Sequence, residues 1–235
     1  MLLIDGDILA YKVSAACEAP VYWGDDLWTL HADAKEGRAQ VDEWLNRLDD
    51  DLENRTGMSV YLSSQTNYRM DVYAEYKANR KDKRKPMILK PMRDYLTDKW
   101  AAKQIPDLEA DDLIGMEATR PGGADIIVSI DKDFKTVPCL LYNPDKPELG
   151  IQRITHSEAD YWFMYQTLCG DATDNYSGCP GVGPKKAEAL LKGCEGVKEM
   201  WSVVVKAFDK AGLSSKHALT PVSYTHLTLP TNREV

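Results

Sequence analysis

The sequence predicts an α/β fold with a mostly parallel, doubly wound sheet, followed by a smaller helical subdomain. Short apolar runs alternate with helical patterns over residues 1–156, and strand patterns stop after that point. The chain has 235 residues, of which 43% are hydrophobic and 28% charged, enough for one such domain with a helical appendage. We therefore expect the α/β domain at residues 1–156 and the helices at residues 157–219.

The individual elements follow from the spacing of apolar side chains. Short apolar runs predict strands at residues 2–4, 59–62, 125–130 and 139–142. Apolar residues at helical spacing predict helices at residues 34–55, 91–103, 108–119, 157–168, 185–192 and 197–211. Residues 220–235 are rich in Thr and Pro and lack a helical period, so we expect a non-native tail there.

The composition excludes several classes of protein. The five cysteines are odd in number and form no C-x-x-C pair, which argues against a disulfide framework or a zinc site. The four histidines lack the close spacing that borderline metals use, so any metal must be held by oxygen. No apolar run approaches the roughly 18 residues of a membrane span, and we expect a cytoplasmic protein with no membrane partner.

The net charge is −8, but acidic and basic residues are segregated along the chain. Phosphate binding usually needs positive charge, and residues 77–90 supply it locally, with Asp82 as the single acid among seven basic residues. Acids dominate elsewhere, partly along the predicted helix at residues 42–53, which we interpret as a solvated face. The basic residues are Lys77, Arg80, Lys81, Lys83, Arg84, Lys85 and Lys90.

Carboxylates recur where predicted strands end. Asp5 follows the first strand, and Asp131 and Asp133 flank the end of the third, where an extended pair two residues apart points to one side. In open parallel sheets, ligands bind beyond the carboxyl ends of the strands, so these acids are site candidates.

Further carboxylates lie at predicted helix starts. Glu109 and Asp112 share one helix face and Asp111 lies about 100° away, so two of the three could bind while the third reaches the rim. Asp171 and Asp174 again share a face near an expected helix start. Eight carboxylates thus form the candidate metal set: Asp5, Glu109, Asp111, Asp112, Asp131, Asp133, Asp171 and Asp174.

Such a cluster of like charges requires compensation by cations. Oxygen-only ligands fit Mg²⁺ or Mn²⁺, and two ions roughly 4 Å apart activate water and stabilise the leaving oxygen in phosphodiester hydrolysis. Asp is also common at helix starts and turns, so any single pair is explained as well or better by a cap. The recurrence of acids at several element ends is what favours the metal site.

A Gly-rich segment at residues 178–187 is the candidate for phosphate binding. A Gly-rich turn that enters a helix exposes backbone N–H groups and the positive end of the helix dipole. Gly181 and Gly183 would form this turn, and Lys185 and Lys186 would add charge. It resembles the hairpin between two helices that grips the duplex backbone, and an ordinary connecting turn is the alternative.

Taken in order, these motifs resemble the flap-endonuclease-like 5′-nucleases, which include the 5′-nuclease domain of bacterial DNA polymerase I and phage 5′→3′ exonucleases. The resemblance covers nearly all of residues 1–219. Within the family, the sequence is most similar to short-tailed-phage exonucleases, in NYR at 67–69 and in DNYSG at 174–178. The motifs are IDGD at 4–7, YKANRK at 76–81, LEADD at 108–112, SIDKDFK at 129–135 and GDATDN at 170–175, before the Gly-rich turn.

The resemblance implies a PIN-like nuclease domain at residues 1–156, with a basic arch at about 67–90, and a DNA-binding helix-hairpin-helix subdomain at residues 157–219. It implies two Mg²⁺ or Mn²⁺ ions and allows a K⁺ ion at the hairpin turn. The expected substrate is duplex DNA with 5′ ends or flaps, with RNA–DNA hybrids as a further candidate. A monomer is expected, acting in phage DNA replication, primer removal or DNA degradation in the cytoplasm of a host cell.

The resemblance also assigns roles to individual residues. Asp5, Glu109, Asp111, Asp112 and Asp131 would hold or orient one metal ion, and Asp133, Asp171 and Asp174 the second. Asp5 and Asp131 would act with Lys77 and Arg80 in catalysis, because these two cations approach the scissile phosphate. Lys81 belongs to the same DNA-binding segment. Tyr11 would stack on the terminal base, or it is a core tyrosine on a buried helix.

One position departs from the family pattern. The family has an aspartate after the second strand, where Ser64 stands in this sequence, so one metal site would be weaker or completed by water. This leaves a catalytically impaired DNA-binding relative as an alternative function. Asp5-Gly6-Asp7 after an apolar strand also resembles the nucleophile motif of haloacid-dehalogenase-type phosphatases, which would leave the basic segment and the Gly-rich turn without a role.

Overall fold

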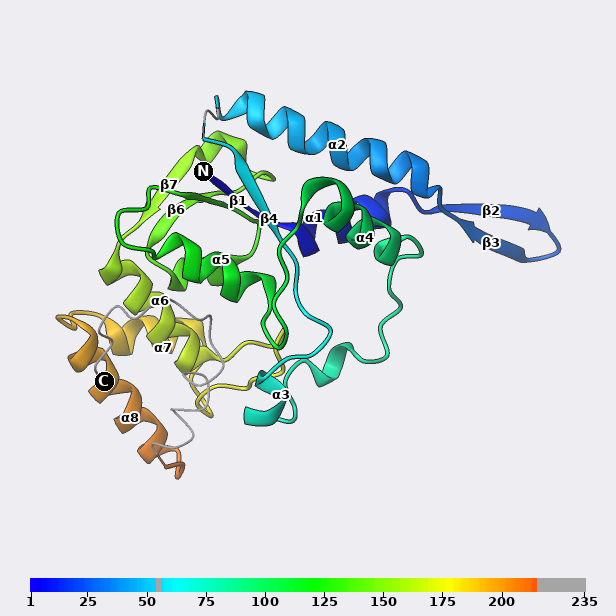
Figure 1. The fold of residues 1–235 in the computed structure, drawn as a ribbon. Coiled ribbons are helices and arrows are strands. Elements are labelled where there is room, and N and C mark those ends of the chain that lie inside the picture. The colour runs from blue at the N-terminus through cyan, green and yellow to red at the C-terminus, as the bar shows by residue number, and fades with distance from the viewer. Residues whose placement is uncertain (54–55, 215–235) are drawn as a thin grey trace.

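The computed structural model describes residues 1–53 and 56–214, and it contains one five-stranded sheet with helices on both faces (Figure 1). The strand order is β4-β1-β5-β6-β7, in which β4, β1, β5 and β6 are parallel and β7 runs antiparallel to β6. The predicted mostly parallel sheet is therefore confirmed. The strands are β1 (Leu2–Asp5), β4 (Met58–Tyr61), β5 (Ile126–Val128), β6 (Cys139–Tyr142) and β7 (Ile151–Ile154).

Alternate side chains of the central strand β1 enter two different cores. Leu2 and Ile4 pack in the cluster that includes helices α1 (Gly6–Ala16), α2 (Ala34–Asp51) and α4 (Leu89–Trp100). Leu3 points to the opposite face and packs with α5 (Ala110–Ala118). Because β1 is buried on both faces, its sequence is continuously apolar, and only its final residue, Asp5, is polar.

The helices at the C-terminal end form a separate core. Helices α6 (His156–Cys169), α7 (Pro184–Leu191) and α8 (Val197–Lys210) bury Phe163, Leu191 and Phe208 among other apolar side chains. All three lie within one residue of the predicted bounds, and α4 and α5 lie within three residues of theirs. Helix α6 begins with a capping box in which Thr155 and Glu158 bond each other's backbone N–H groups.

Several elements were not predicted, and helix α1 is one of them. Strands β2 (Ala19–Gly24) and β3 (Leu27–His31) form an antiparallel hairpin that projects from the body (Figure 1), and Asp25 and Asp26 form its turn with φ values of 47° and 59°. Strand β7 was also missed, because three of its four side chains are exposed and it shows no buried apolar run.

The basic segment is mostly irregular, with short turns of helix at α3 (Arg69–Val72) and η1 (Ala78–Arg80). Other 3₁₀ turns are η2 (Lys132–Thr136) and η3 (Pro147–Leu149). The expected tail at residues 220–235, and the end of the helix predicted at residues 34–55, lie outside the described residues. None of the helices in residues 1–53 and 56–214 combines the length and apolarity needed to cross a membrane.

Candidate active site

Five carboxylates from three separate parts of the chain line one small cavity, which we call the acidic cavity. Its volume is about 80 Å³, and Thr173 and three cations complete its lining. Five of the eight predicted carboxylates thus line one cavity, whereas Asp5, Glu109 and Asp112 are not part of its lining. The charged residues of the acidic cavity are Asp111, Asp131, Asp133, Asp171, Asp174, Lys77, Arg80 and Lys132.

Asp5 lies close to this cavity because the chain turns sharply from β1 into α1. A Cβ at Gly6 would lie 2.6 Å from the carbonyl oxygen of Tyr61, so only glycine permits this turn against β4. Asp5 caps α1 by accepting the Ile8 N–H at 3.1 Å and also accepts the Ser129 hydroxyl at 3.0 Å. The Ser129 hydroxyl oxygen in turn accepts the Asp131 N–H at 3.1 Å, so one serine joins the two predicted ligands.

The surroundings of Asp5 disfavour its ionised form. Burial, together with the negative charges of Asp111 and Asp131, raises the pKa of Asp5 to about 7, in spite of the hydrogen bonds from Ile8 and Ser129. The side chain is only 8% exposed. A bound cation would reverse this effect, because it would stabilise the carboxylate.

Asp131 and Asp133 are brought together by a 3₁₀ turn, so the expected extended pair is wrong. Asp131 caps η2, and its Oδ1 accepts the Asp133 N–H at 2.9 Å. Lys132 between them places its Nζ 3.0 Å from Asp171 Oδ2. The turn therefore supplies both an acid pair and a cation to the cavity.

Asp171 and Asp174 lie in a closed loop after α6, so the expected helix start is wrong. Asp171 and Tyr176 exchange backbone hydrogen bonds of 2.7 and 2.8 Å across the loop. Gly170 and Gly178 close it with φ values of 79° and 68°, and a Cβ on Gly178 would lie 2.3 Å from the Gly170 nitrogen. Two glycines are needed here for backbone reasons, which fixes the loop that carries both acids.

The two acids of this loop differ in their electrostatic environment. Burial would raise the pKa of Asp171, but Lys132 and the Thr173 N–H outweigh it and hold the pKa below its usual value. Burial raises the pKa of Asp174, and this is only partly offset by Lys77 and Arg80. Asp174 is therefore the carboxylate of this loop with the greater need of a further cation.

Gln166 was not predicted as a site residue. Its side-chain amide donates to Asp133 Oδ1 at 2.7 Å and to Asp171 Oδ2 at 3.1 Å, which links the 3₁₀ turn to the loop. The one available signal was a polar side chain that follows the apolar and aromatic run 161–165 of α6, five residues before Asp171.

A buried arginine holds Asp112 instead of leaving it open to the cavity. Arg69 Nη1 and Nη2 each lie 2.6 Å from an oxygen of Asp112, and the two side chains are 1% and 0% exposed. The guanidinium carbon of Arg69 lies 4.9 Å from the ring centre of Tyr68 and 5.8 Å from that of Tyr76. The structure therefore places Asp111, and not Asp112, in the lining of the acidic cavity.

Glu109 is also engaged by the basic segment. Its oxygens lie 2.8 Å from Lys77 Nζ and 2.7 Å from the Tyr76 hydroxyl. Burial alone would raise the pKa of Glu109, but the positive charges of Lys77 and Arg69 outweigh it and lower the pKa. Lys77 Nζ is also 3.8 Å from Asp174, so this lysine bridges two of the predicted metal ligands.

Arg80 contacts the loop after α6. Its Nη2 lies 3.3 Å from Asp174 Oδ1, and its Nε donates to the Thr173 carbonyl at 3.1 Å. Lys77 and Arg80 thus line the acidic cavity, where they compensate the carboxylates.

The donor chemistry of the acidic cavity fits a hard divalent cation. Its five carboxylates outnumber its three cations, and all candidate donors are oxygens. Within the described part of the chain, no three His, Cys, Asp or Glu side chains are arranged to hold one metal ion as they stand. The reason is visible in the contacts, because Lys77, Lys132 and Arg69 hold Glu109, Asp171 and Asp112 respectively.

The remaining predicted site residues lie outside the acidic cavity. Tyr11 is 51% exposed on α1, so the alternative of a core tyrosine is wrong. Lys81 is exposed on the basic segment. Ser64, the position expected to carry an aspartate, lines a different groove beside Lys85 and Arg93 and is not part of the lining of the acidic cavity.

The Gly-rich turn leads into α7 as predicted. Gly183 caps this helix, Pro184 is its first residue and Gly181 adopts a φ of 71°. Lys186 donates to the Gly181 carbonyl at 3.0 Å. Lys185 is exposed beside it.

Acidic and basic side chains gathered beyond the carboxyl ends of parallel strands are typical of enzymes that act on phosphate esters. The family described as "5′-3′ exonuclease, N-terminal resolvase-like domain" matches residues 1–140. The chain belongs to this family of 5′-3′ exonucleases, which confirms the predicted class of enzyme.

Individual relatives agree with this assignment. The exodeoxyribonuclease of Enterobacteria phage T3 is 31% identical over 231 residues, which cover 92% of this chain and 74% of that protein. The exonuclease of Escherichia phage T7 is 32% identical over 205 residues, which cover 81% of this chain and 66% of that protein. The chain thus spans about two thirds to three quarters of the length of these relatives.

A solved structure shares the fold. The flap endonuclease D15 of bacteriophage T5, determined in complex with DNA and metal ions, has a TM-score of 0.63 and 15% identity, and the match covers 94% of this chain and 89% of that one. The haloacid-dehalogenase alternative is set aside, because the family differs and both Asp5 oxygens are engaged as acceptors in a buried position.

Proposed function

We propose that the chain hydrolyses DNA phosphodiester bonds at 5′ ends and 5′ flaps, with two Mg²⁺ or Mn²⁺ ions held at the acidic cavity. The observation that carries this proposal is the meeting of five carboxylates from three chain segments with Lys77 and Arg80 in one cavity. The T5 flap endonuclease, which shares the fold, was determined in complex with both DNA and metal ions, and this supports the proposal that the chain binds the same two kinds of ligand.

The eight predicted carboxylates would divide between the two ions. Asp5, Glu109, Asp111, Asp112 and Asp131 would hold or orient one ion, and Asp133, Asp171 and Asp174 the second. When bound, the ions would compensate the clustered negative charge and polarise the scissile phosphate and water. Asp112 would act mainly through its ion pair with Arg69, which orients the start of α5.

Lys77 and Arg80 would supply positive charge at the scissile phosphate. Both lie at the cavity in contact with Asp174, and Lys77 also holds Glu109 at 2.8 Å. Once released from Glu109, the Lys77 ammonium would be within reach of a phosphate at the cavity mouth. Lys81 would contact the backbone further along the strand, and Tyr11 would stack on the terminal base.

DNA contacts away from the chemistry would come from the helical subdomain at residues 157–219. We infer that α6, the Gly-rich turn and α7 act as a helix-hairpin-helix unit, in which the N–H groups at Gly181 and Gly183 and the side chains of Lys185 and Lys186 bind phosphates. A K⁺ ion would bind backbone carbonyls of this turn, and the duplex would extend from it to the basic segment at residues 67–90. The proposed unit is a monomer, acts in phage DNA replication, primer removal or DNA degradation, and also accepts RNA–DNA hybrids.

Substitution of two cavity acids tests the proposal. Asp131→Asn and Asp174→Asn should abolish cleavage of end-labelled duplex and flap DNA in Mg²⁺ or Mn²⁺ while DNA binding in chelator is retained. Asp98→Asn, an exposed acid on α4, is the matched control and should cleave normally. Normal cleavage by both cavity variants would refute the proposed site, and salt-sensitive DNA binding with no product from the parent chain would favour the impaired DNA-binding relative.

Lys77→Ala tests the role of the basic segment. It should slow single-turnover cleavage far more than it weakens DNA binding, because the charge acts on the reacting phosphate. Lys83→Ala, in the same segment but outside the cavity lining, is the control and should affect mainly binding. Equal losses in cleavage and binding for Lys77→Ala would reduce Lys77 to a plain phosphate contact.

A further inference from the structure

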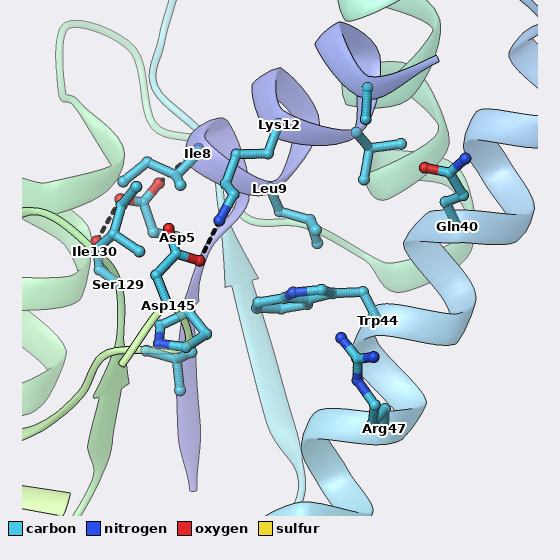
Figure 2. A pocket seen from close by; sticks show the side chains of 14 residues that line it. Asp5, Ile8, Leu9, Lys12, Gln40, Trp44, Arg47, Ser129, Ile130 and Asp145 are labelled. Atoms are coloured by element: carbon cyan, nitrogen blue, oxygen red, sulfur yellow. Dashed lines mark hydrogen bonds and ion pairs between the residues drawn. The ribbon is translucent and has the colours of Figure 1, made fainter. Parts of the chain in front are cut away.

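A second cavity, lined in part by Asp5, lies between α1, α2 and the loop after β6 (Figure 2). Its volume is about 290 Å³. We call it the Trp44 cavity, because the ring of Trp44 on α2 forms one of its walls (Figure 2). Asp5 and Ser129 form another wall. The Ser129 hydroxyl donates to Asp5 and accepts the Asp131 N–H, so the Trp44 cavity adjoins the acidic cavity, although the two share no lining residue.

The inside of the Trp44 cavity is apolar and aromatic. Leu9 and Val13 of α1 and Val128 of β5 line it together with the half-buried Trp44. A volume of about 300 Å³ with apolar walls and a few polar groups is the usual form of a small-molecule site. An indole beside aliphatic side chains suits a flat ring system, which would gain both burial and stacking.

Two cations from different helices line the cavity. Arg47 of α2 reaches the rim beside Trp44 (Figure 2), and no residue of the described chain forms an ion pair with it. Lys12 of α1 pairs with Asp145, and the two side chains are 43% and 48% exposed, so a competing anion could displace this pair at little cost. Asp5 also lines the cavity, with its two oxygens directed at the Ile8 N–H and the Ser129 hydroxyl.

We propose that the Trp44 cavity binds a nucleoside monophosphate. The base would lie against Trp44, its edge near the amide of Gln40, and the phosphate would bind Arg47, with Lys12 adding positive charge to the lining. An apolar ligand would leave the two cations unused, and free phosphate would leave the aromatic wall unused. The choice of a nucleotide among aromatic anions rests on the proposed function, because hydrolysis at a 5′ end releases nucleoside monophosphates.

Binding of dAMP in a chelator tests the site without any metal or cleavage. Titration calorimetry of the full chain should show saturable binding that is weakened about tenfold or more in Arg47→Gln and in Trp44→Leu, and is retained in Trp44→Phe. Asp145→Asn should tighten binding, because it frees Lys12. Trp28→Leu, an exposed tryptophan on the β2–β3 hairpin, is the matched control and should bind as the parent does.

Several results would overturn the inference. They are absence of saturable dAMP binding, parental affinity in Arg47→Gln, or binding of deoxyadenosine or inorganic phosphate as tight as that of dAMP. Arg47 is exposed, so its variant should fold normally even if a Trp44 variant does not. Cleavage of DNA in Mg²⁺ by a chain that does not bind dAMP would refute the pocket alone, whereas dAMP binding without cleavage would support the pocket and refute the proposed function.

Discussion

Replacement of Arg69 by methionine should strongly destabilise the protein, because it would leave a carboxylate buried without its cation. Arg69 and Asp112 are 1% and 0% exposed, and both nitrogen–oxygen distances are 2.6 Å. Removal of one partner of such a pair costs about 3–5 kcal/mol, since water cannot reach the remaining charge. A domain of this kind has a stability of about 5–15 kcal/mol, so the variant should fold with a much reduced margin.

Urea and thermal unfolding in chelator would measure this loss. A cost of about 3–5 kcal/mol corresponds to a fall in Tm of about 6–20 °C for a domain of this size. Arg120→Met is the matched control, because Arg120 forms an ion pair with Glu117 on α5 but its side chain is 58% exposed. The control should change stability by no more than about 1 kcal/mol.

A double variant separates the charge effect from the loss of packing. Arg69→Met combined with Asp112→Leu removes both charges, and should recover most of the loss apart from about 1 kcal/mol for the capping box at Glu109. The reasoning would be refuted if the single variant lost no more stability than Arg120→Met. A double variant no more stable than Arg69→Met would refute it equally.

Three further predictions concern the cavity and its supports. The pKa of Asp5 is raised from 3.8 to about 7, so its contribution to stability is present at low pH and lost as the pH rises through 7. In chelator, Asp5→Asn should therefore gain up to about 4 kcal/mol over the parent at pH 8 and less at pH 5 in urea unfolding, and an equal gain at both pH values would contradict the assignment. Lys132→Met should tighten Mn²⁺ binding several-fold by calorimetry, because it removes the cation that holds Asp171, whereas tight binding by the control Lys146→Met as well would point to net charge alone. Gly178→Ala should cost about 1–3 kcal/mol or more and impair Mg²⁺-dependent cleavage, while Gly122→Ala, at a φ of 80° with open space around it, should cost less and cleave normally.

The sequence predicted the parts of the fold that depend on local patterns. Strands β1 and β5 are continuously apolar because both faces are buried, and acids at their ends could be assigned to one edge because parallel strands share a direction. Helices α6, α7 and α8, which form the separate C-terminal core, were likewise predicted from the spacing of their apolar residues. The β2–β3 hairpin was not, because its side chains are mostly exposed and carry no alternation of buried and polar positions.

The pairing within the site depended on contacts that no local pattern contains. Arg69 and Asp112 are 43 residues apart, and Gln166 reaches Asp133 across 33 residues. Helical geometry alone placed Glu109 and Asp112 on the binding face, whereas the basic segment covers that face and leaves Asp111 at the cavity. The alternative that these acids are caps holds for Asp5 and Asp131, and Asp131 caps its turn while also lining the acidic cavity.

The acid cluster and the basic segment are therefore parts of one electrostatic unit. In the protein alone, Lys77 joins Glu109 to Asp174, and Arg69 fixes Asp112, so the basic segment is attached to the acids through its own cations. A divalent cation that binds Glu109 must compete with Lys77 for this carboxylate. Linkage is reciprocal, so the free energy by which Lys77 weakens metal binding equals the free energy by which the metal weakens the attachment of the basic segment. The same exchange that costs metal affinity would release a positive charge at the place where a phosphate has to bind.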